Sequence, residues 1–447
     1  MTATETSNAI EAARFVGAAK GRNYPGEIVD AARMCLVDWA GVAIGAESEG
    51  AGRAVRQVVA AWGTAGNACV LLGRPMAPTA AALINGTMAH CLDYDDTHVG
   101  SVAHISGPTW AAALAVGTHL GAGEQDIVSA FITGFEVGAR LGGGGLGQAV
   151  SRRGFHSTGI VGCLAAATAS AVLMGLDEDG IVRALGAAAT QTGGLTASFG
   201  TMSKPFHAGK AALNGVLAAE LAAAGFEPAR GLIEPGDGLA KAVVQDGVAT
   251  VPTLDFSDGW EITRNTFKPY ASCLLTHPVI DAARSLSGEV EGREIAAVEA
   301  VVHPMAIELA GKTAPTTGLE GKFSIAYCAA LGLNGYPATF VDFSDERLTD
   351  EAVRTTTDRV EYVATEDMAT TAARMVVRFA DGAELDADVP LALGNPGNPM
   401  SWADMEEKFM ALVSPVMGES ASELFAVLRN FDEAGRLDAL VELVGRD

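Results

Sequence analysis

Apolar residues recur at helical spacing over almost the whole first half of this chain, and this pattern limits the possible folds most. From about residue 8 to residue 225 they return every three or four positions. Glycines follow several of these apolar runs, as they do at helix C-termini. The pattern predicts a large all-helical region whose clearest helices are Glu27–Ile44, Ala80–Leu92, Thr109–Leu120, Glu124–Leu141, Thr158–Leu176 and Lys210–Ala224.

Alternating segments replace the helical pattern in the region from about Cys273 to Leu393. Ile295–His303, Arg359–Ala364 and Arg374–Phe379 alternate between apolar and polar positions and are rich in β-branched residues. Ala380–Ala383, which contains an Asp-Gly pair, follows one of these runs and predicts a hairpin turn. This region is therefore predicted to be a small α+β domain.

The helical pattern returns near the C-terminus. Gly394–Pro399 has the composition of a linker, and Ser401–Met417 and Ala421–Val444 after it are helical in pattern. The simplest layout is mainly α: a large all-helical domain built from both chain ends, with a smaller α+β domain inserted between them. We predict residues 1–266 and 398–447 for the helical domain and 267–397 for the inserted one. A cleft between two such domains is a natural ligand site.

The charge balance narrows the class of partner. The 447 residues include 54 acidic and 30 basic side chains, which gives a net charge of −24 at pH 7. Nucleic acids and anionic membranes are polyanions and would be repelled, so neither is an expected partner. A small anionic substrate stays possible because a local group of Lys, Arg and His can oppose the overall field.

The cellular compartment is expected to be the cytoplasm. The six cysteines form no CxxC pair and are far too sparse for a disulfide scaffold, so free thiols are expected. The first fifteen residues have neither a basic nor an apolar signal-peptide region. Ser157–Leu176 carries no charge, but its many small residues suit a helix packed inside a soluble core better than a membrane span.

The densest polar cluster is His90–His98, with His104 a few residues further on. It contains three carboxylates and three imidazoles within fifteen residues. Asp and His are metal ligands, but there is no HExxH motif and no regular ligand spacing. Three interpretations stay open at this point: acid–base or substrate-binding residues on a loop, metal ligands, or a solvated loop.

Two further clusters stand directly before expected helices. Arg152–Gly159 offers a helix N-terminus, an Arg pair and His156, which together suit an anion. The alternative is that Ser157 only caps the helix and His156 is a surface residue. In Met202–Lys210, Lys204 precedes a proline, which predicts an extended segment where the ammonium could bind a carboxylate or act as a base.

The remaining clusters lie at the predicted domain boundary and in the inserted domain. They are Phe267–His277, with Lys268 and a terminal His, and Lys322–Tyr327. There is no GxSxG motif and no cysteine in a recognisable nucleophile motif, so nothing indicates covalent catalysis. This inventory of His, Lys, Tyr and Asp suits the binding of a polycarboxylate and proton transfer at a carbon beside a carboxylate.

Taken together and in this order, the clusters resemble the MmgE/PrpD family over nearly the whole chain. The matching motifs are Asp93–His98, Gly154–Gly159, Ser203–Lys210, Lys268–Tyr270 with Thr276–His277, Lys322–Ser324 with Tyr327, and Gly397–Ser401. The resemblance implies a large helical domain with a smaller α+β lid domain, in a homodimer or a higher homo-oligomer. It implies no metal and no organic cofactor. Family activities include 2-methylcitrate dehydratase, cis-aconitate decarboxylase and iminodisuccinate epimerase.

The resemblance also assigns site residues. Positions similar to those that line the site in the decarboxylase branch are Asp93, Thr97, His104, His156, Lys204, Lys268, His277 and Tyr327. His104 and His277 are then expected to transfer protons, with Tyr327 as an acid and Asp93 orienting a base. Substrate carboxylates would be bound by Thr97, His156, Lys204 and Lys268. Tyr270–Cys273 departs from the dehydratase pattern, and Leu274 stands where some relatives have Arg.

These observations predict an enzyme that binds a small di- or tricarboxylate between its domains. The leading hypothesis is a lyase, close to cis-aconitate decarboxylation or to dehydration of a citrate-like acid. The alternative enzyme is a two-base epimerase of an amino-dicarboxylate such as iminodisuccinate. A non-catalytic carboxylate-binding protein is the alternative from another class.

Overall fold

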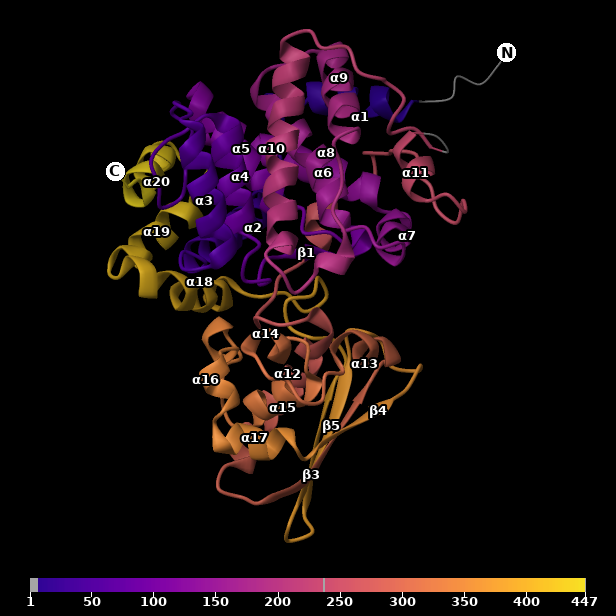
Figure 1. Cartoon of the computed structure of the whole chain (residues 1–447), viewed down its shortest axis with the longest axis vertical. Helices are drawn as coiled ribbons and strands as arrows, with labels where there is room; N and C mark the ends of the chain where they lie inside the picture. Colours follow the sequence, from indigo (N-terminus) through magenta and orange to yellow (C-terminus); the bar gives the residue numbers. More distant parts are fainter. Residues whose placement is uncertain (1–6, 236–237, 447) are drawn as a thin grey trace. The chain divides into compact units, whose positions relative to one another are not determined.

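The computed structural model describes residues 7–235 and 238–446 and shows a mainly helical protein, as predicted (Figure 1). Its contacts divide the chain into two compact units. One comprises the chain up to Thr266 together with the part from Met405 onward, and the other is Phe267–Asp404. The Gly- and Pro-rich segment Gly394–Pro399 belongs to the second unit. The two units are described separately below.

The first unit is built from α-helices around one central helix, α8. This helix, Ser157–Leu173, packs against α5, α6, α9 and α10, and its residues from Ser157 to Ala171 are all buried (Figure 1). Small side chains allow these neighbours to approach closely. The α-helices of this unit are α1 (Asn8–Gly17), α2 (Gly26–Gly45), α3 (Gly50–Trp62), α4 (Pro78–Met88), α5 (Ser106–Leu120), α6 (Glu124–Gly142), α7 (Leu146–Arg152), α8, α9 (Glu178–Ala189), α10 (Ser203–Ala223), α11 (Gly238–Val243), α18 (Trp402–Met417, whose first turn falls in the second unit), α19 (Ser420–Arg429) and α20 (Arg436–Val444).

Two predicted helices differ from the structure. The helix expected to begin at Lys210 begins at Ser203, so the extended segment expected around Lys204 is wrong. Pro205 is compatible with this start because an N–H in the first helical turn has no intrahelical acceptor. The single helix expected over Ala421–Val444 is two helices, α19 and α20, and Gly435 directly before α20 has a φ of 85°.

The second unit contains a four-stranded sheet in the order β4-β3-β5-β6. The strands β3 and β4 are parallel, whereas β3 with β5 and β5 with β6 are antiparallel, so the predicted hairpin at Ala380–Ala383 is confirmed. The strands are β3 (Ile295–Val302), β4 (Val360–Ala364), β5 (Ala373–Phe379) and β6 (Glu384–Val389), and the helices are α12 (His277–Val290), α13 (Pro304–Ala310), α14 (Gly318–Gly321), α15 (Ile325–Leu333), α16 (Asp345–Leu348) and α17 (Glu351–Thr357).

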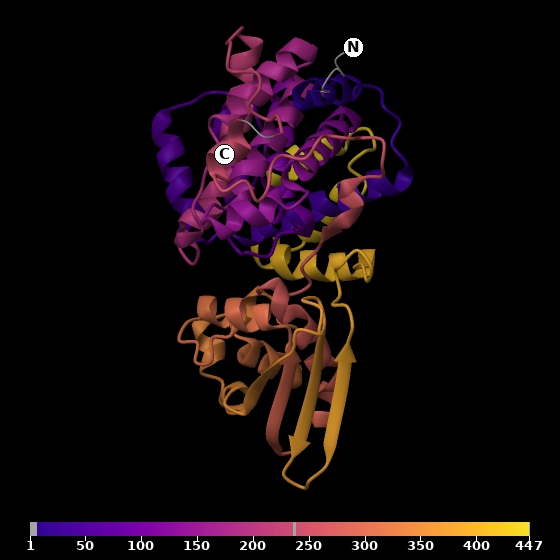
Figure 2. The same ribbon diagram turned by 90° about the vertical axis from the view of Figure 1, so that its right-hand side faces the viewer.

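The alternation seen in the sequence gives this sheet one buried face and one charged face. Val298, Ala300 and Val377 are buried in a core shared with α12 and α15, which cover that side of the sheet (Figure 2). On the opposite face Arg378 pairs with Glu299 and with a carboxylate of β6. One buried and one solvated face is typical of sheets that contain antiparallel pairs, as two of the three strand pairs are here.

Short elements connect the helices. The two-residue strands β1 (Thr97–His98) and β2 (Asn265–Thr266) pair antiparallel within the first unit, and the 3₁₀ turns are η1 (Val99–Ser101), η2 (Thr196–Ser198), η3 (Glu261–Arg264), η4 (Leu274–Thr276) and η5 (Phe340–Asp342). No helix of the described residues is long and apolar enough to cross a membrane. No disulfide links the six cysteines, all of which belong to the described part of the chain.

Candidate functional site

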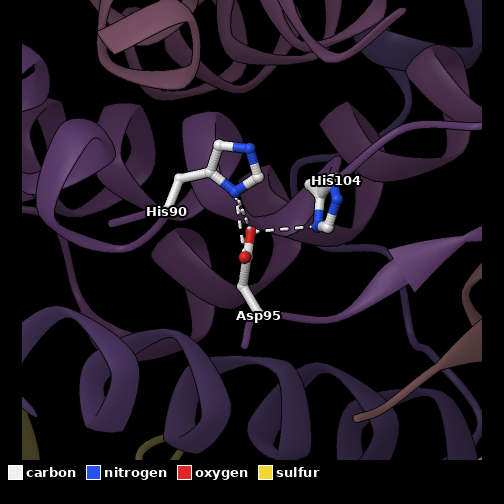
Figure 3. A group of neighbouring side chains, drawn as sticks. All are labelled: His90, Asp95 and His104. Atoms are coloured by element: carbon white, nitrogen blue, oxygen red, sulfur yellow. Dashed lines mark hydrogen bonds and ion pairs between the residues drawn. The ribbon is translucent and has the colours of Figure 1, made fainter. Parts of the chain in front are cut away.

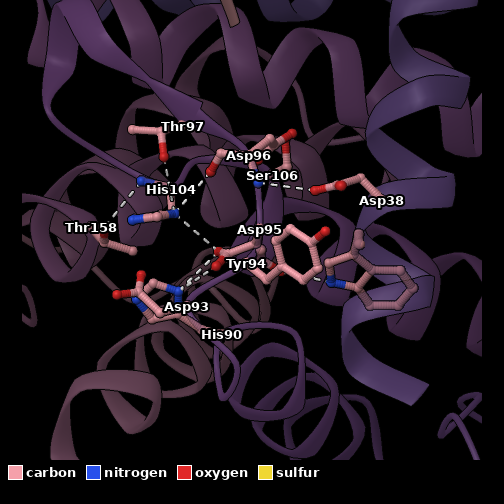
Figure 4. A network of polar contacts seen from close by, with 12 residues as sticks. Asp38, His90, Asp93, Tyr94, Asp95, Asp96, Thr97, His104, Ser106 and Thr158 are labelled. Carbon is pink, nitrogen blue, oxygen red and sulfur yellow. Dashed lines mark hydrogen bonds and ion pairs between the residues drawn. The ribbon is translucent and has the colours of Figure 1, made fainter. Parts of the chain in front are cut away.

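The segment between α4 and α5 carries the densest polar cluster, and it is buried. His90, Asp95 and Asp96 are 1%, 2% and 1% exposed, so the interpretation as a solvated loop is wrong for these residues. Figure 4 shows the polar side chains of this segment, with Asp95 and Asp96 among those labelled. Lys408 of α18 holds the segment, because its ammonium donates to the carbonyl of Tyr94 at 2.8 Å. This contact fixes the loop that carries the site residues.

Lys408 also forms a buried ion pair with Asp38, and Asp38 holds the same loop. Lys408 Nζ lies 2.6 Å from Asp38 Oδ1, and Asp38 Oδ2 accepts the backbone N–H of Asp96 at 2.9 Å. The Asp96 side chain accepts from Ser106 Oγ at 2.5 Å and from Asn265 Nδ2 at 2.7 Å. Burial, and next the charge of Asp38, raises the pKa of Asp96 to about 8. Burial and the neighbouring carboxylate thus disfavour the charged form of Asp96.

His90, Asp95 and His104 form one hydrogen-bonded group (Figure 3). His90 Nδ1 lies 2.9 Å from both carboxylate oxygens of Asp95, and His104 Nδ1 lies 3.1 Å from Asp95 Oδ2. The two rings are tilted, with centroids 4.4 Å apart. A single carboxylate thus contacts both imidazoles.

His104 is tied to three further elements. Its Nδ1 lies 2.8 Å from the carbonyl oxygen of Asp96 and 3.4 Å from Oγ1 of Thr97 in β1. Its backbone N–H donates to Oγ1 of Thr158, in the first turn of α8, at 3.0 Å. The pairing of β1 with β2 positions Thr97, since Thr97 lies opposite Thr266.

Asp93 and Lys204 form the charged pair of the site. Lys204 Nζ lies 2.6 Å from Asp93 Oδ1 and 5.2 Å from the ring centroid of Phe199. Asp93 has a φ of 53°, in the left-handed region that few residues other than glycine adopt. Strained backbone of this kind clusters at functional sites, where surrounding structure holds it.

His156 is buried rather than a surface residue, so that alternative is wrong. It is 4% exposed and directly precedes α8, while Ser157 is the first helical residue and donates to the carbonyl of Ser101 at 2.8 Å instead of capping. His156 Nδ1 lies 3.1 Å from His207 Nδ1, and its ring stacks on His90 with centroids 5.7 Å apart.

Burial dominates the electrostatics of these rings. Burial lowers the pKa of His90 to about 4, partly offset by Asp95. Burial, followed by the charges of His90 and Lys204, holds the pKa of His156 well below its usual range. Both rings are therefore neutral at pH 7 and can donate one hydrogen bond each, but they add no positive charge.

The first unit thus brings five of the eight predicted residues into one contact group: Asp93, Thr97, His104, His156 and Lys204. His90, Asp95 and His207 join them, and none of the three was predicted as a site residue. His90 and Asp95 belong to the cluster that the sequence singled out, five positions apart. Their spacing alone did not show that Asp95 would contact both His90 and His104.

The other three predicted residues lie in the second unit. Lys268 and His277 are 3% and 1% exposed, and His277 begins α12 with its ring packed edge-on against Tyr270. Tyr327 lies in the first turn of α15 and donates its hydroxyl hydrogen to the carbonyl of Asp342 at 2.6 Å. Burial raises the pKa of Tyr327 above its usual range. The roles of these three residues stay predictions.

The His90–Asp95–His104 group is also the place where a metal would fit best among the described residues. One ligand atom from each residue lies within 4.8 Å of the others. Their Nδ1 atoms already hydrogen-bond to Asp95, so a metal would have to replace these bonds. The expectation of no metal stays a prediction with a direct test, given below.

Comparison with known proteins decides the family. The model of the MmgE/PrpD N-terminal domain matches residues 11–251, and that of the MmgE/PrpD C-terminal domain matches residues 270–433. The chain belongs to the MmgE/PrpD family. The two matches cover both structural units, with a gap around the change from one unit to the other.

Several curated MmgE/PrpD relatives carry the same name. The chain is 27% identical over 405 residues to cis-aconitate decarboxylase of Aspergillus terreus, which covers 83% of this chain and 82% of that protein. It is 26% identical over 392 residues to cis-aconitate decarboxylase of Mus musculus, covering 83% and 80%. The human cis-aconitate decarboxylase is 26% identical over 383 residues, covering 82% and 79%.

Proposed function

We propose that this MmgE/PrpD protein is a lyase that acts on a small di- or tricarboxylate, with cis-aconitate as the first substrate to test. The observation that carries the proposal is the contact group of the first unit, which joins the Lys204 ammonium through Phe199 to the rings of His156, His90 and the partly accessible His104. Such a group binds carboxylates and moves a proton. The names of the relatives support the choice of cis-aconitate.

The chemistry requires charge stabilisation and one proton. When the bond between carbon and CO₂ breaks, the electron pair stays on the carbon skeleton, spreads toward a neighbouring carboxylate and is then protonated. Ammonium groups placed beside that carboxylate stabilise the developing charge. We assign this role to Lys204 and, from the second unit, to Lys268. His156 binds a carboxylate as a neutral hydrogen-bond donor, and Thr97 binds through its hydroxyl.

Proton transfer is assigned to His104 and His277. Tyr327 is assigned as an acid, and Asp93 is assigned to orient a base. Histidine suits this task because the ordinary pKa of its side chain lies near neutral pH, so the ring can both accept and donate a proton. The contacts of His104 support its role: its Nδ1 is held by Asp95, Asp96 and Thr97, and its side chain is partly exposed.

The test is proton NMR in D₂O of the purified protein with cis-aconitate, citrate, 2-methylcitrate and a chiral iminodisuccinate in separate tubes. New vinyl signals from cis-aconitate support the decarboxylase, and loss of water from a citrate identifies a dehydratase instead. Deuterium entry with a change of configuration identifies an epimerase. Binding of these acids without any C–H exchange or new product contradicts the proposal and favours a binding protein.

A further inference from the structure

We infer that Asp95, backed by His90, is a positioning group that fixes the proton of His104 on Nδ1 and leaves Nε2 as its basic nitrogen. The inference deepens the proposed function and rests on it for the role of His104 in proton transfer. The location of the proton itself follows from the contacts alone.

His104 Nδ1 lies between two hydrogen-bond acceptors. A carbonyl oxygen, that of Asp96, lies 2.8 Å from this nitrogen, and Asp95 Oδ2 lies 3.1 Å from it. A carbonyl oxygen only accepts hydrogen bonds, and so does an ionised carboxylate. The nitrogen between two acceptors must therefore carry the hydrogen. Thr97 Oγ1, at 3.4 Å, can accept or donate and does not oppose this assignment.

The side chain of Asp95 is an ionised carboxylate. Burial alone would raise its pKa, but the His104 and His90 rings beside it outweigh burial and hold the pKa well below its ordinary value. Asp95 is 2% exposed, so few other groups can compete for its oxygens. The carboxylate is thus an acceptor for both rings.

The rings of His90 and His104 differ in their exposure. The side chain of His90 is 0% exposed, whereas that of His104 is 12% exposed. His90 Nδ1 lies 2.9 Å from both oxygens of Asp95 and so holds the carboxylate from the buried side. Of the two rings, His104 is the one that a substrate can reach, and its Nε2 is the nitrogen left for that contact.

The catalytic consequence is a stabilised imidazolium. When His104 Nε2 takes up a proton from solvent, the ring becomes positively charged with both nitrogens protonated. Asp95 then lies beside that charge without taking the proton, and Nε2 gives the proton to the carbon skeleton once CO₂ has left. A buried carboxylate that orients a histidine in this way is a general device in enzymes.

The substitution that tests this role is Asp95→Asn. The amide has a similar shape, but its NH₂ can donate to His104 Nδ1 and so favour the tautomer with the hydrogen on Nε2. We expect kcat to fall ~10²- to 10⁴-fold while KM changes less than about threefold. The limb of the kcat/KM profile that reports the protonation of His104 should also move, which a loosened fold alone would not cause.

The matched control is Glu136→Gln. Glu136 is a fully buried carboxylate of α6 that accepts the backbone N–H groups of Glu261 and Ile262. This substitution removes an equally buried charge from the same unit and should leave kcat within about threefold of wild type. Equal losses of kcat in Asp95→Asn and Glu136→Gln would overturn the inference, because the effect would then be one on folding.

A measurement on the wild-type protein keeps the inference testable if Asp95→Asn does not fold. Histidine-selective ¹⁵N labelling and NMR report the tautomer of each ring, and the chain has only eight histidines. We expect His104 with its hydrogen on Nδ1, and an Nε2–H tautomer would overturn the inference. If the tautomer is as expected but wild type converts none of the acids, the proton assignment stands and the proposed function is contradicted.

Discussion

Lys204 Nζ lies 2.6 Å from Asp93 Oδ1, and the two side chains are only 14% and 17% exposed. The backbone holds both ends: Asp93 by its left-handed conformation, and Lys204 by its place in the first turn of α10. The ammonium is therefore in position before a substrate arrives. A substrate carboxylate would share or replace Asp93 as its partner.

Lys204→Met should weaken substrate binding and also slow the chemical step, because the ammonium is assigned both to carboxylate binding and to the charge that develops when CO₂ leaves. A hydrogen bond to a charged group contributes about 1.5–3 kcal/mol, so KM should rise roughly 10- to 150-fold. Lys204→Arg keeps the charge and should lose less. Steady-state kinetics with cis-aconitate separate KM from kcat, and an unchanged KM in Lys204→Met would argue against carboxylate binding by this residue.

Lys408→Met should destabilise the first unit strongly. It removes one partner of a buried ion pair, because the side chains of Lys408 and Asp38 are 3% and 1% exposed. Breaking a buried pair in this way costs about 3–5 kcal/mol in the free energy of unfolding. Urea unfolding measures this loss, and Asp38→Asn added to Lys408→Met should recover part of it.

The control for that loss is an exposed ion pair. Lys312 and Glu320 pair with side chains that are 44% and 31% exposed. Lys312→Met should change the free energy of unfolding by less than about 1 kcal/mol. Similar losses in the two lysine variants would contradict the account of the buried pair.

Stability should fall in acid, and His90 should contribute to the fall. Burial lowers its pKa from 6.5 to about 4. Between these values the unfolded chain binds a proton that the folded chain does not, so the free energy of unfolding decreases as pH falls from 6.5 toward 4. Each unit of pKa difference corresponds to about 1.4 kcal/mol. In urea unfolding at several pH values, His90→Gln should show a shallower slope across this window, and an unchanged slope would exclude His90 as a source.

Removal of metals should leave the enzyme active. We expect dialysis against EDTA to change turnover of cis-aconitate by less than about twofold, because no step of the account needs a metal and metal-dependent sites lose function to chelators. Elemental analysis should find far less than one metal ion per chain. Loss of activity that zinc restores would instead indicate a metal held by His90, Asp95 and His104.

Periodicity predicted most of the regular structure. The helix expected at Glu124–Leu141 is α6, Glu124–Gly142, and the strand expected at Ile295–His303 is β3, Ile295–Val302. These elements each bury one face or are buried throughout, and burial is what periodicity reports. The start of α10 was missed because a proline indicates an interruption, although the first turn of a helix tolerates one.

The candidate site was predicted less completely. Its residue types were visible in the sequence, but the hydrogen bonds of Asp95 to two rings depend on how the loop between α4 and α5 is folded back. That fold depends on Lys408, more than three hundred positions away, whose contact with Tyr94 leaves no local pattern in the sequence. Long-range contacts of this kind are the part that a single sequence does not give.

The most direct test of the central claim is a proton NMR time course of cis-aconitate in D₂O with wild type, His104→Ala, His277→Ala and Glu136→Gln. The account predicts new vinyl signals with wild type and Glu136→Gln. It predicts rates lower by ~10²-fold or more with each histidine variant. No reaction of cis-aconitate with the wild-type protein, or near-normal rates in both histidine variants, would contradict it.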